Sequence, residues 1–192
     1  MTKTGSKTVR FVHYRTVQKL AALMVPFYKT IAGNHDYAAR WSKAVIATDV
    51  QRMERMLAAV SPKTEGLPLA SNGIGYFVSI PAGIRDIQLT NGTTIPPGTV
   101  QFTFETRIHR AIARAVLPLY RELARNCGFA RALARAIRTN DAKTVRMMVR
   151  SLVRTSALRS VNVDVEDGGL ALNFKYRSSK YIYRNLLFRE TD

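Results

Sequence analysis

The sequence predicts an α+β protein built from two related units, and two observations lead to that prediction. Apolar residues recur at helical spacing in some segments and alternate with polar residues in others, which indicates both helices and strands. In addition, residues 23–34 (LMVPFYKTIAGN) are echoed 92 positions later by residues 115–126 (AVLPLYRELARN). At this offset, 8 of the 36 residues from 25 to 60 are identical. The echo favours an internal duplication, and two unrelated Ala-rich amphipathic helices are the alternative.

The first expected unit runs through a strand, three helices and a hairpin. Pro26 lacks a backbone N–H, so the first helix should kink or restart there. Asp36 and Asp49 are suited to cap the next two helices, and Asn91-Gly92 is the strongest hairpin-turn signal in the chain. The elements in order are a strand or helix start at 9–14, helices at 15–32, 36–47 and 50–60, a loop at 63–72, and strands at 73–80 and 84–90.

Two consecutive prolines mark the end of this unit. In Ile95-Pro96-Pro97-Gly98 neither proline can donate a hydrogen bond to a neighbouring strand, so no central strand continues through them. We therefore expect a flexible basic arm at 1–8, a first α+β unit at 9–96 and a second, more basic α+β unit at 97–192.

The second expected unit repeats this order, and Pro118 interrupts its first helix as Pro26 does in the first unit. Valines alternate with polar residues after the third helix, and an acidic, glycine-containing turn follows, which together indicate a hairpin. The elements in order are a strand at 99–104, helices at 105–126, 129–138 and 142–155, strands at 159–165 and 170–176, and a tail at 181–188 that fits either a strand or a short helix.

Within the second unit a short helix (129–137), a tight turn (138–141), a second helix (142–155) and a hairpin (161–176) follow one another. This order resembles the winged helix-turn-helix architecture of many DNA-binding proteins. The resemblance is one of topology, covers about residues 130–180, and includes no family-specific motif. It implies that the second helix would be the recognition helix and the hairpin the wing.

The composition indicates a globular chain with an anionic partner. Apolar residues make up 46% of the 192 residues, enough to fill a core, whereas the net charge is +17 and the pI is near 10.7. That charge exceeds what solubility requires, which favours DNA, RNA or an anionic membrane as partner. The single cysteine, Cys127, excludes an internal disulfide and Cys-rich metal sites. Because the longest apolar run, 20–27, is too short to span a bilayer, we expect a cytoplasmic protein, or one inside a virion.

Cationic side chains concentrate in residues 105–160, which carry 13 Lys or Arg against three acidic residues. At about 100° per residue, the arginines of helix 105–126 fall on one narrow stripe opposite its apolar face. The two following helices each present a basic face. The tail mixes basic and aromatic residues as base-stacking surfaces do, with sheet packing of its tyrosines as the alternative. The predicted nucleic-acid-binding residues are Arg107, Arg110, Arg114, Arg121, Arg125, Arg131, Arg135, Arg138, Lys143, Arg146, Arg150, Arg154, Lys175, Arg177, Lys180 and Arg184.

Signals for catalysis or metal binding are weak. Gly33-Asn34-His35-Asp36 has the form of an element of metal-dependent phosphoesterases, but the chain has three histidines in all and lacks the remaining ligands of a two-metal site. Helix capping explains Asn34 and Asp36. We expect His109 to contact phosphate or solvent beside the arginine stripe, and Cys127 to be a small buried residue. Since phosphate-loop, dinucleotide and nucleophile motifs are missing, we expect no enzyme, no metal and no cofactor.

The sequence therefore predicts a non-enzymatic nucleic-acid-binding protein, with DNA favoured over RNA. The basic residues of helix 142–155 would contact the groove or its phosphates, and those of helix 105–126 would add sequence-independent attraction. One alternative is a structural subunit of a phage, a virus particle or another large assembly, a homo-oligomer whose basic face lines nucleic acid. Another is peripheral attachment to anionic membranes, which the scarcity of bulky aromatics on the basic helices makes the least favoured.

Overall fold

The computed structural model describes residues 13–83, 87–96, 98, 102–164 and 169–191, and these form an α+β fold, as predicted. The helices are α1 (Tyr14–Gly33), α2 (His35–Ile46), α3 (Val50–Val60), a short 3-10 helix η1 (Pro62–Thr64), α4 (Thr106–Arg125), α5 (Cys127–Arg138) and α6 (Ala142–Leu152). The strands are β1 (Leu69–Ser71), β2 (Gly75–Pro81), β3 (Gln88–Thr94), β4 (Leu158–Asp164), β5 (Gly169–Lys175) and β6 (Ile182–Thr191).

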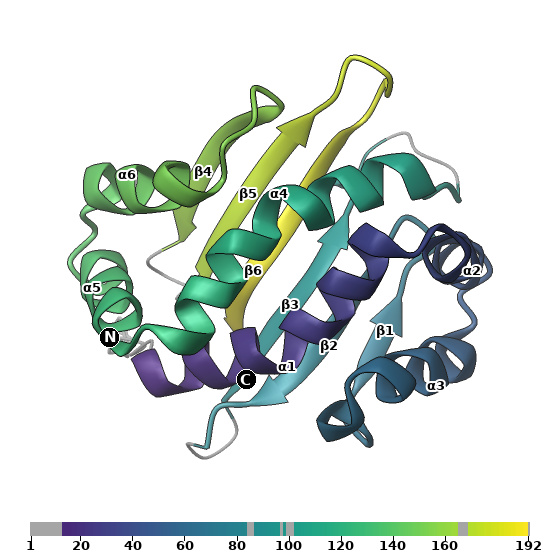
Figure 1. The fold of residues 1–192 in the computed structure, drawn as a ribbon, viewed down its shortest axis with the longest axis horizontal. Helices are drawn as coiled ribbons and strands as arrows, with labels where there is room; N and C mark the ends of the chain where they lie inside the picture. The colour runs from purple at the N-terminus through teal and green to yellow at the C-terminus, as the bar shows by residue number, and fades with distance from the viewer. Residues whose placement is uncertain (1–12, 84–86, 97, 99–101, 165–168, 192) are drawn as a thin grey trace, which may run out of the picture.

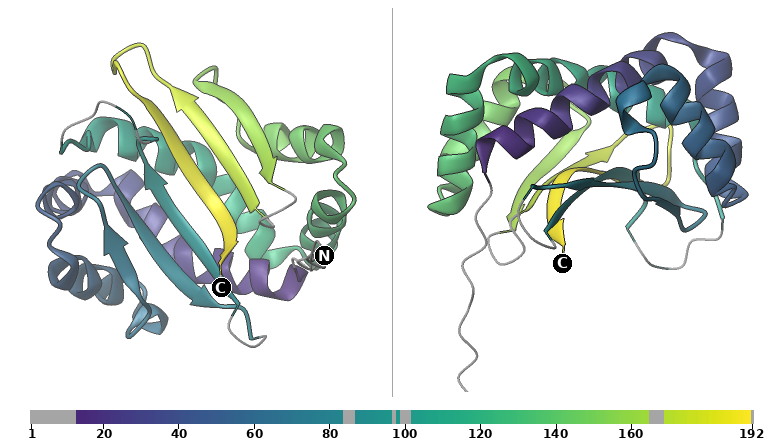
Figure 2. Two further views of the ribbon diagram at one scale, coloured as in Figure 1. Left: turned by 180° about the vertical axis from the view of Figure 1, so that it is seen from behind. Right: turned by 90° about the horizontal axis from the view of Figure 1, so that it is seen from below.

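All of these strands belong to one six-stranded antiparallel sheet, in the order β1-β2-β3-β6-β5-β4. The helices cover one face of the sheet, as the side view in Figure 2 shows, and the strands of the other face lie open in the view from behind. The central β3–β6 pair joins the strands of the first half of the chain to those of the second. The two halves therefore share one sheet and one core.

The two longest helices, α1 and α4, have 20 residues each and lie side by side across the sheet (Figure 1). Their inner faces supply much of the core, including Met24 and Phe27 from α1 and Leu119 from α4. Each helix continues through its proline, Pro26 or Pro118, and does not restart there. Burial of apolar residues on both sides of each proline holds the helix together despite the missing hydrogen bond.

The two halves repeat the same order of three helices and three strands. The helices have 20, 12 and 11 residues in both halves. Asn34 and Asn126 cap the second helix of each half, and Asp49 and Asp141 cap the third, in each case through a side-chain oxygen that accepts a backbone N–H. The helices and their caps thus recur at the 92-residue offset seen in the sequence.

At 9–14, where a strand and a helix start were both open, Tyr14 begins α1, and residues 9–12 lie outside the described chain. Three details of the predicted order are wrong. Residues 102–105 lead into α4 without strand structure, and 99–101 are not described. Asn34 and not Asp36 caps α2, and a three-residue strand, β1, forms within the segment expected to be a loop. The tail, for which strand and helix were both open, is the strand β6.

The predicted turn at Asn91-Gly92 is also wrong, because both residues lie in the middle of β3. A Cβ atom on Gly92 would lie 2.0 Å from the carbonyl oxygen of Tyr76, so glycine is required by the close approach of β2 and not by a turn. The connection between β2 and β3 instead falls at 82–87, where the Ala82 N–H donates to the Ile87 carbonyl at 2.9 Å.

A closed ring of hydrogen bonds, which we call the Tyr-Asn ring, lies where α1 and α4 cross β3 and β6. The Tyr28 hydroxyl donates to Asn91 Oδ1 (3.1 Å), and Asn91 Nδ2 donates to the Tyr120 hydroxyl (2.6 Å). The Tyr120 hydroxyl donates to Asn185 Oδ1 (3.3 Å), and Asn185 Nδ2 donates to the Tyr28 hydroxyl (3.0 Å), which closes the ring. All four side chains are fully buried. Each half of the chain contributes one tyrosine and one asparagine.

The Tyr-Asn ring should make a large contribution to stability. Asn91→Ala would remove the acceptor of Tyr28 and leave the buried Tyr120 hydroxyl and the Leu187 carbonyl without their donor. We expect the free energy of unfolding, measured by urea denaturation, to fall by about 3 kcal/mol or more. Asn162→Ala, on the exposed part of β4, is the matched control and should cost less than about 1 kcal/mol. Equal small losses for both variants would contradict this account.

Candidate nucleic-acid interface

The most cationic part of the molecule is the end formed by α5 and α6, at the left of Figure 1. The Asn126 side chain accepts the Phe129 N–H at the start of α5, and the Asp141 side chain accepts the Thr144 N–H at the start of α6, both at 3.0 Å. These caps fix where each helix begins and hence which face it buries. Leu133 and Val149 point into the core, whereas seven cations are exposed. The exposed set is Arg131, Arg135, Arg138, Lys143, Arg146, Arg150 and Arg154.

The sixteen predicted residues are all exposed or half-buried, but they do not form a single surface. Seven lie at the α5–α6 end, five lie along α4, and four lie on or beside β5 and β6. Arg184 belongs to the last group and follows the buried Tyr183 in β6, so its side chain points to the open face of the sheet. Of the aromatic residues in the tail, Tyr183 is fully buried, and Tyr176 and Tyr181 are half-buried against the core.

The stripe along α4 is partly occupied by contacts within the protein. Guanidinium N–H groups of Arg110 and Arg114 each donate to the Ala32 carbonyl at 3.2 Å. These hydrogen bonds give the Ala32 carbonyl, at the C-terminal end of α1, a donor, and the two positive charges complement the negative end of the helix dipole. Arg107 donates to the Ser178 carbonyl at 3.3 Å. Arg121 and Arg125, on the α5 side of the helix, are exposed.

Corresponding parts of the two halves differ sharply in charge. Residues 34–65, which span α2, α3 and η1, carry five Lys or Arg and four Asp or Glu, a net charge of +1. Residues 126–157, 92 positions later, carry seven basic residues and one acidic residue, a net charge of +6. The charge is thus polarised between two ends that share the same order of helices.

A groove between α6 and β4, which we call the α6–β4 groove, gathers three of the arginines. It has a volume of about 510 Å³ and is lined by Arg146 and Arg150 from α6 and by Arg159 from β4, with Asn140 and Asn162 beside them. The Arg150 guanidinium donates to the Arg159 carbonyl at 3.3 Å, which holds it against the strand. Arg159 was not among the predicted residues, because strand alternation alone does not show that it faces a helix.

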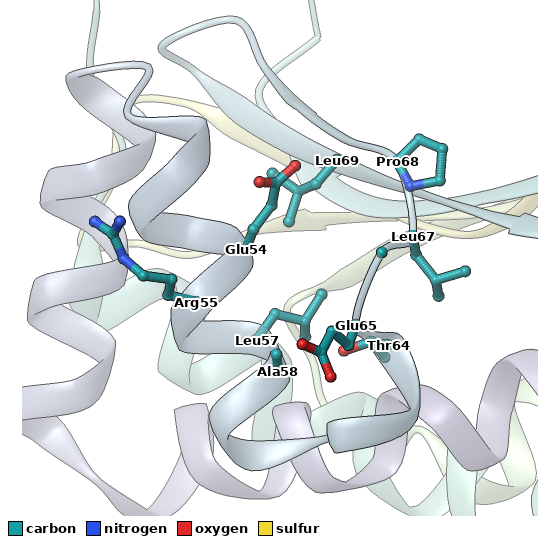
Figure 3. A pocket seen from close by; sticks show the side chains of 10 residues that line it. Glu54, Arg55, Leu57, Ala58, Thr64, Glu65, Leu67, Pro68 and Leu69 are labelled. Carbon is teal, nitrogen blue, oxygen red and sulfur yellow. The ribbon is translucent and has the colours of Figure 1, made fainter.

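The first half has a pocket at the matching place, between α3, η1 and β1 (Figure 3). Its volume is about 290 Å³, and its floor is apolar, with Leu57 and Leu69 among the lining residues. Figure 3 shows the carboxylates of Glu54 and Glu65 beside this pocket. Glu54 stands where the second half has Arg146, 92 positions later. Arg55 also lines this pocket, so its charge is mixed, whereas the charged residues that line the α6–β4 groove are all arginines.

The cations of the α6–β4 groove are not neutralised by neighbouring acids. None of the sixteen predicted residues forms an ion pair within 4 Å with a carboxylate of the described chain. Asp141, the acidic residue nearest in sequence, is already engaged as a helix cap. Hydrogen bonds from Thr144 hold the pKa of Asp141 below its usual value, so it stays ionised in that role.

Two expectations about single residues are wrong. His109 is fully buried and does not contact phosphate or solvent, and its Nε2 lies 3.0 Å from the Tyr76 hydroxyl. It lies where α4 packs on both the sheet and α2, so the buried face of the helix is wider than its apolar stripe suggests. Cys127 is exposed and not buried. Among the described residues, no group of three or more His, Cys, Asp or Glu is arranged to hold a metal ion.

The buried His109 should make stability depend on pH. Burial lowers the pKa of His109 to about 3, whereas the unfolded chain binds a proton near pH 6.5. The stability contribution of neutral His109 is therefore complete above pH 6.5 and is lost as the pH falls toward 3, at up to about 1.4 kcal/mol per pH unit. Urea denaturation from pH 7 to pH 4 should show this slope, and His109→Phe should reduce it. An unchanged slope in the variant would contradict the prediction.

Comparison with models of known protein families, with curated proteins and with solved structures finds no match to this chain. Within the described residues, no helix combines the length and hydropathy needed to cross a bilayer.

Proposed function

We propose that this protein binds nucleic acid without catalysing a reaction, and that the α5–α6 end with the α6–β4 groove is the contact surface. The observation that carries the proposal is the charge difference between two ends with the same helix order, +6 against +1. If the positive charge served solubility alone, it would not need to be concentrated at one end of the molecule. The class of ligand that such a positively charged surface attracts is a polyanion.

The residue type supports phosphate as the group that is bound. Arginine supplies two parallel N–H donors to a phosphate and is more weakly hydrated than lysine. Residues 97–192 carry 15 arginines and three lysines. Arg146 and Arg150 are one helical turn apart on α6, so their guanidinium groups can meet neighbouring phosphates of one backbone.

The arrangement of α5, α6 and the β4–β5 hairpin is the basis for a more specific proposal. These elements follow one another as in a winged helix-turn-helix, and α6 would then be the helix that lies against the nucleic acid. We also propose that the two halves arose by duplication, since their helices and caps recur at one offset. In this view one copy kept a mixed charge and the other became basic.

Replacing two arginines of the groove should weaken binding and make it less sensitive to salt. For Arg146→Gln with Arg150→Gln, we expect the affinity for a fluorescent DNA duplex to fall about tenfold or more at moderate salt. The slope of log K against log salt should become less negative by about 1.8, that is, about 0.9 for each lost phosphate contact. Fluorescence anisotropy titrations at several salt concentrations measure both quantities.

The matched control removes the same charge from the other end. Arg52→Gln with Arg55→Gln lies on α3, the counterpart of α6, and should change affinity by less than about threefold. Thermal unfolding of both double variants checks that each is folded. Equal losses for the two variants would show that only total charge matters, and an absence of duplex and single-strand binding by the unaltered protein would overturn the proposed function.

A further inference from the structure

The open face of the sheet carries an apolar row that crosses four strands and ends at Asn162 on a fifth. Strand pairing aligns Phe77 with Gly92, Gly92 with Leu186, Leu186 with Ala171, and Ala171 with Asn162. The neighbours of these residues along the strands, such as Tyr76 and Leu172, are buried beneath the helices. The row therefore points away from the helices, toward the face that is uncovered in the rear view of Figure 2.

Phe77, Leu186 and Ala171 of this row line a hollow of about 680 Å³. Gly92 has no side chain, so the half-buried ring of Phe77 and the half-buried side chain of Leu186 border a flat area between them. A half-buried phenyl ring beside a shallow apolar floor offers a stacking surface for a planar ring, and nucleobases of every kind have such a face.

Cationic side chains flank the row on both sides along β6. Arg184 lies opposite Thr94, and Arg189 lies opposite Thr90, and both line the hollow. The Arg184 Nε donates to Asn173 Oδ1 at 3.0 Å, which holds the guanidinium over the sheet. Among the described strand residues that point to this face, Asp164 at the end of β4 is the acidic one. The face therefore combines a stacking ring with positive charge.

The hollow is continuous with the α6–β4 groove. Asn140, Asn162 and Val163 line both. A path of polar and cationic groups thus leads from Arg146 and Arg150 around the edge strand β4 and onto the open face of the sheet.

From this geometry we infer that the open face binds a single-stranded segment of nucleic acid, with one base stacked on Phe77 and its phosphates near Arg184 and Arg189. The inference rests on the proposed function and specifies the form of the ligand. Duplex DNA is stiff over about 150 base pairs, so it cannot bend sharply around the edge strand β4. Its paired bases also present no free face to Phe77. A second copy of the chain is disfavoured, because the same cations would then face one another.

The test compares Phe77→Leu with Phe77→Trp, because leucine keeps an apolar side chain without the ring and tryptophan keeps the ring. The probes are a fluorescent oligodeoxythymidine of about 12 nucleotides, within the range of known site sizes, and a hairpin duplex whose two strands are joined by a non-nucleotide linker, so that it has no unpaired base. Phe77→Leu should weaken binding of the oligodeoxythymidine about 5- to 100-fold, as loss of one stacked base does, and should change hairpin binding less than twofold. Phe77→Trp should retain single-strand binding.

Arg184→Gln supplies a second readout that a purely structural role would not change. The salt slope for the oligodeoxythymidine should become less negative by about 0.7, the value for one phosphate of a single strand, while the slope for the hairpin stays the same. Unaltered single-strand binding in Phe77→Leu, or equal losses for both probes, would overturn this inference and leave duplex binding by α6 intact. Failure of the unaltered protein to bind either probe would instead overturn the proposed function.

Discussion

The fold depends on the Tyr-Asn ring at the junction of α1, α4, β3 and β6. Two asparagine amides and two tyrosine hydroxyls are buried there, where each unpaired polar atom would cost free energy. Each group finds its partner only if β3 and β6 are neighbours and both long helices cross above them. The ring therefore stabilises one register between the two halves and joins them into one sheet.

This junction determines where the functional surfaces lie. Because β3 and β6 are central, the third helix of each half is carried to an outer edge of the sheet, α3 beside β1 and α6 beside β4. Two similar ends then differ in their side chains, with Glu54 at one and Arg146 at the other. Because the described helices all lie on one face, no described helix covers the other face, and the α6–β4 groove leads onto it around the edge.

The sequence was most informative where local physics decides the structure. Helical periodicity located α2, α3, α5 and α6 to within a few residues, and Asp49 caps α3 as predicted. The exposure of the cations at the α5–α6 end followed from the same periodicity. The parts that depend on pairing between distant segments were not predicted. Asn91-Gly92 has the local signature of a turn, but contacts with Tyr28 and β2 keep it within a strand. His109 was expected to be accessible, because helical periodicity does not show which elements pack against α4. Arg159 was missed, because strand alternation does not show that α6 lies beside it. The division of the basic residues among the α5–α6 end, α4 and the sheet likewise required the topology.

The central claim is that nucleic acid binds at one end of this polarised molecule, and protection of arginines from chemical modification tests it most directly. The protein would be treated with phenylglyoxal with and without saturating DNA, and the modified residues identified by mass spectrometry of its peptides. The account predicts protection of Arg146, Arg150 and Arg159, with Arg40, Arg52 and Arg55 modified as in the free protein. Equal protection at the two ends, or protection confined to α2 and α3, would contradict it.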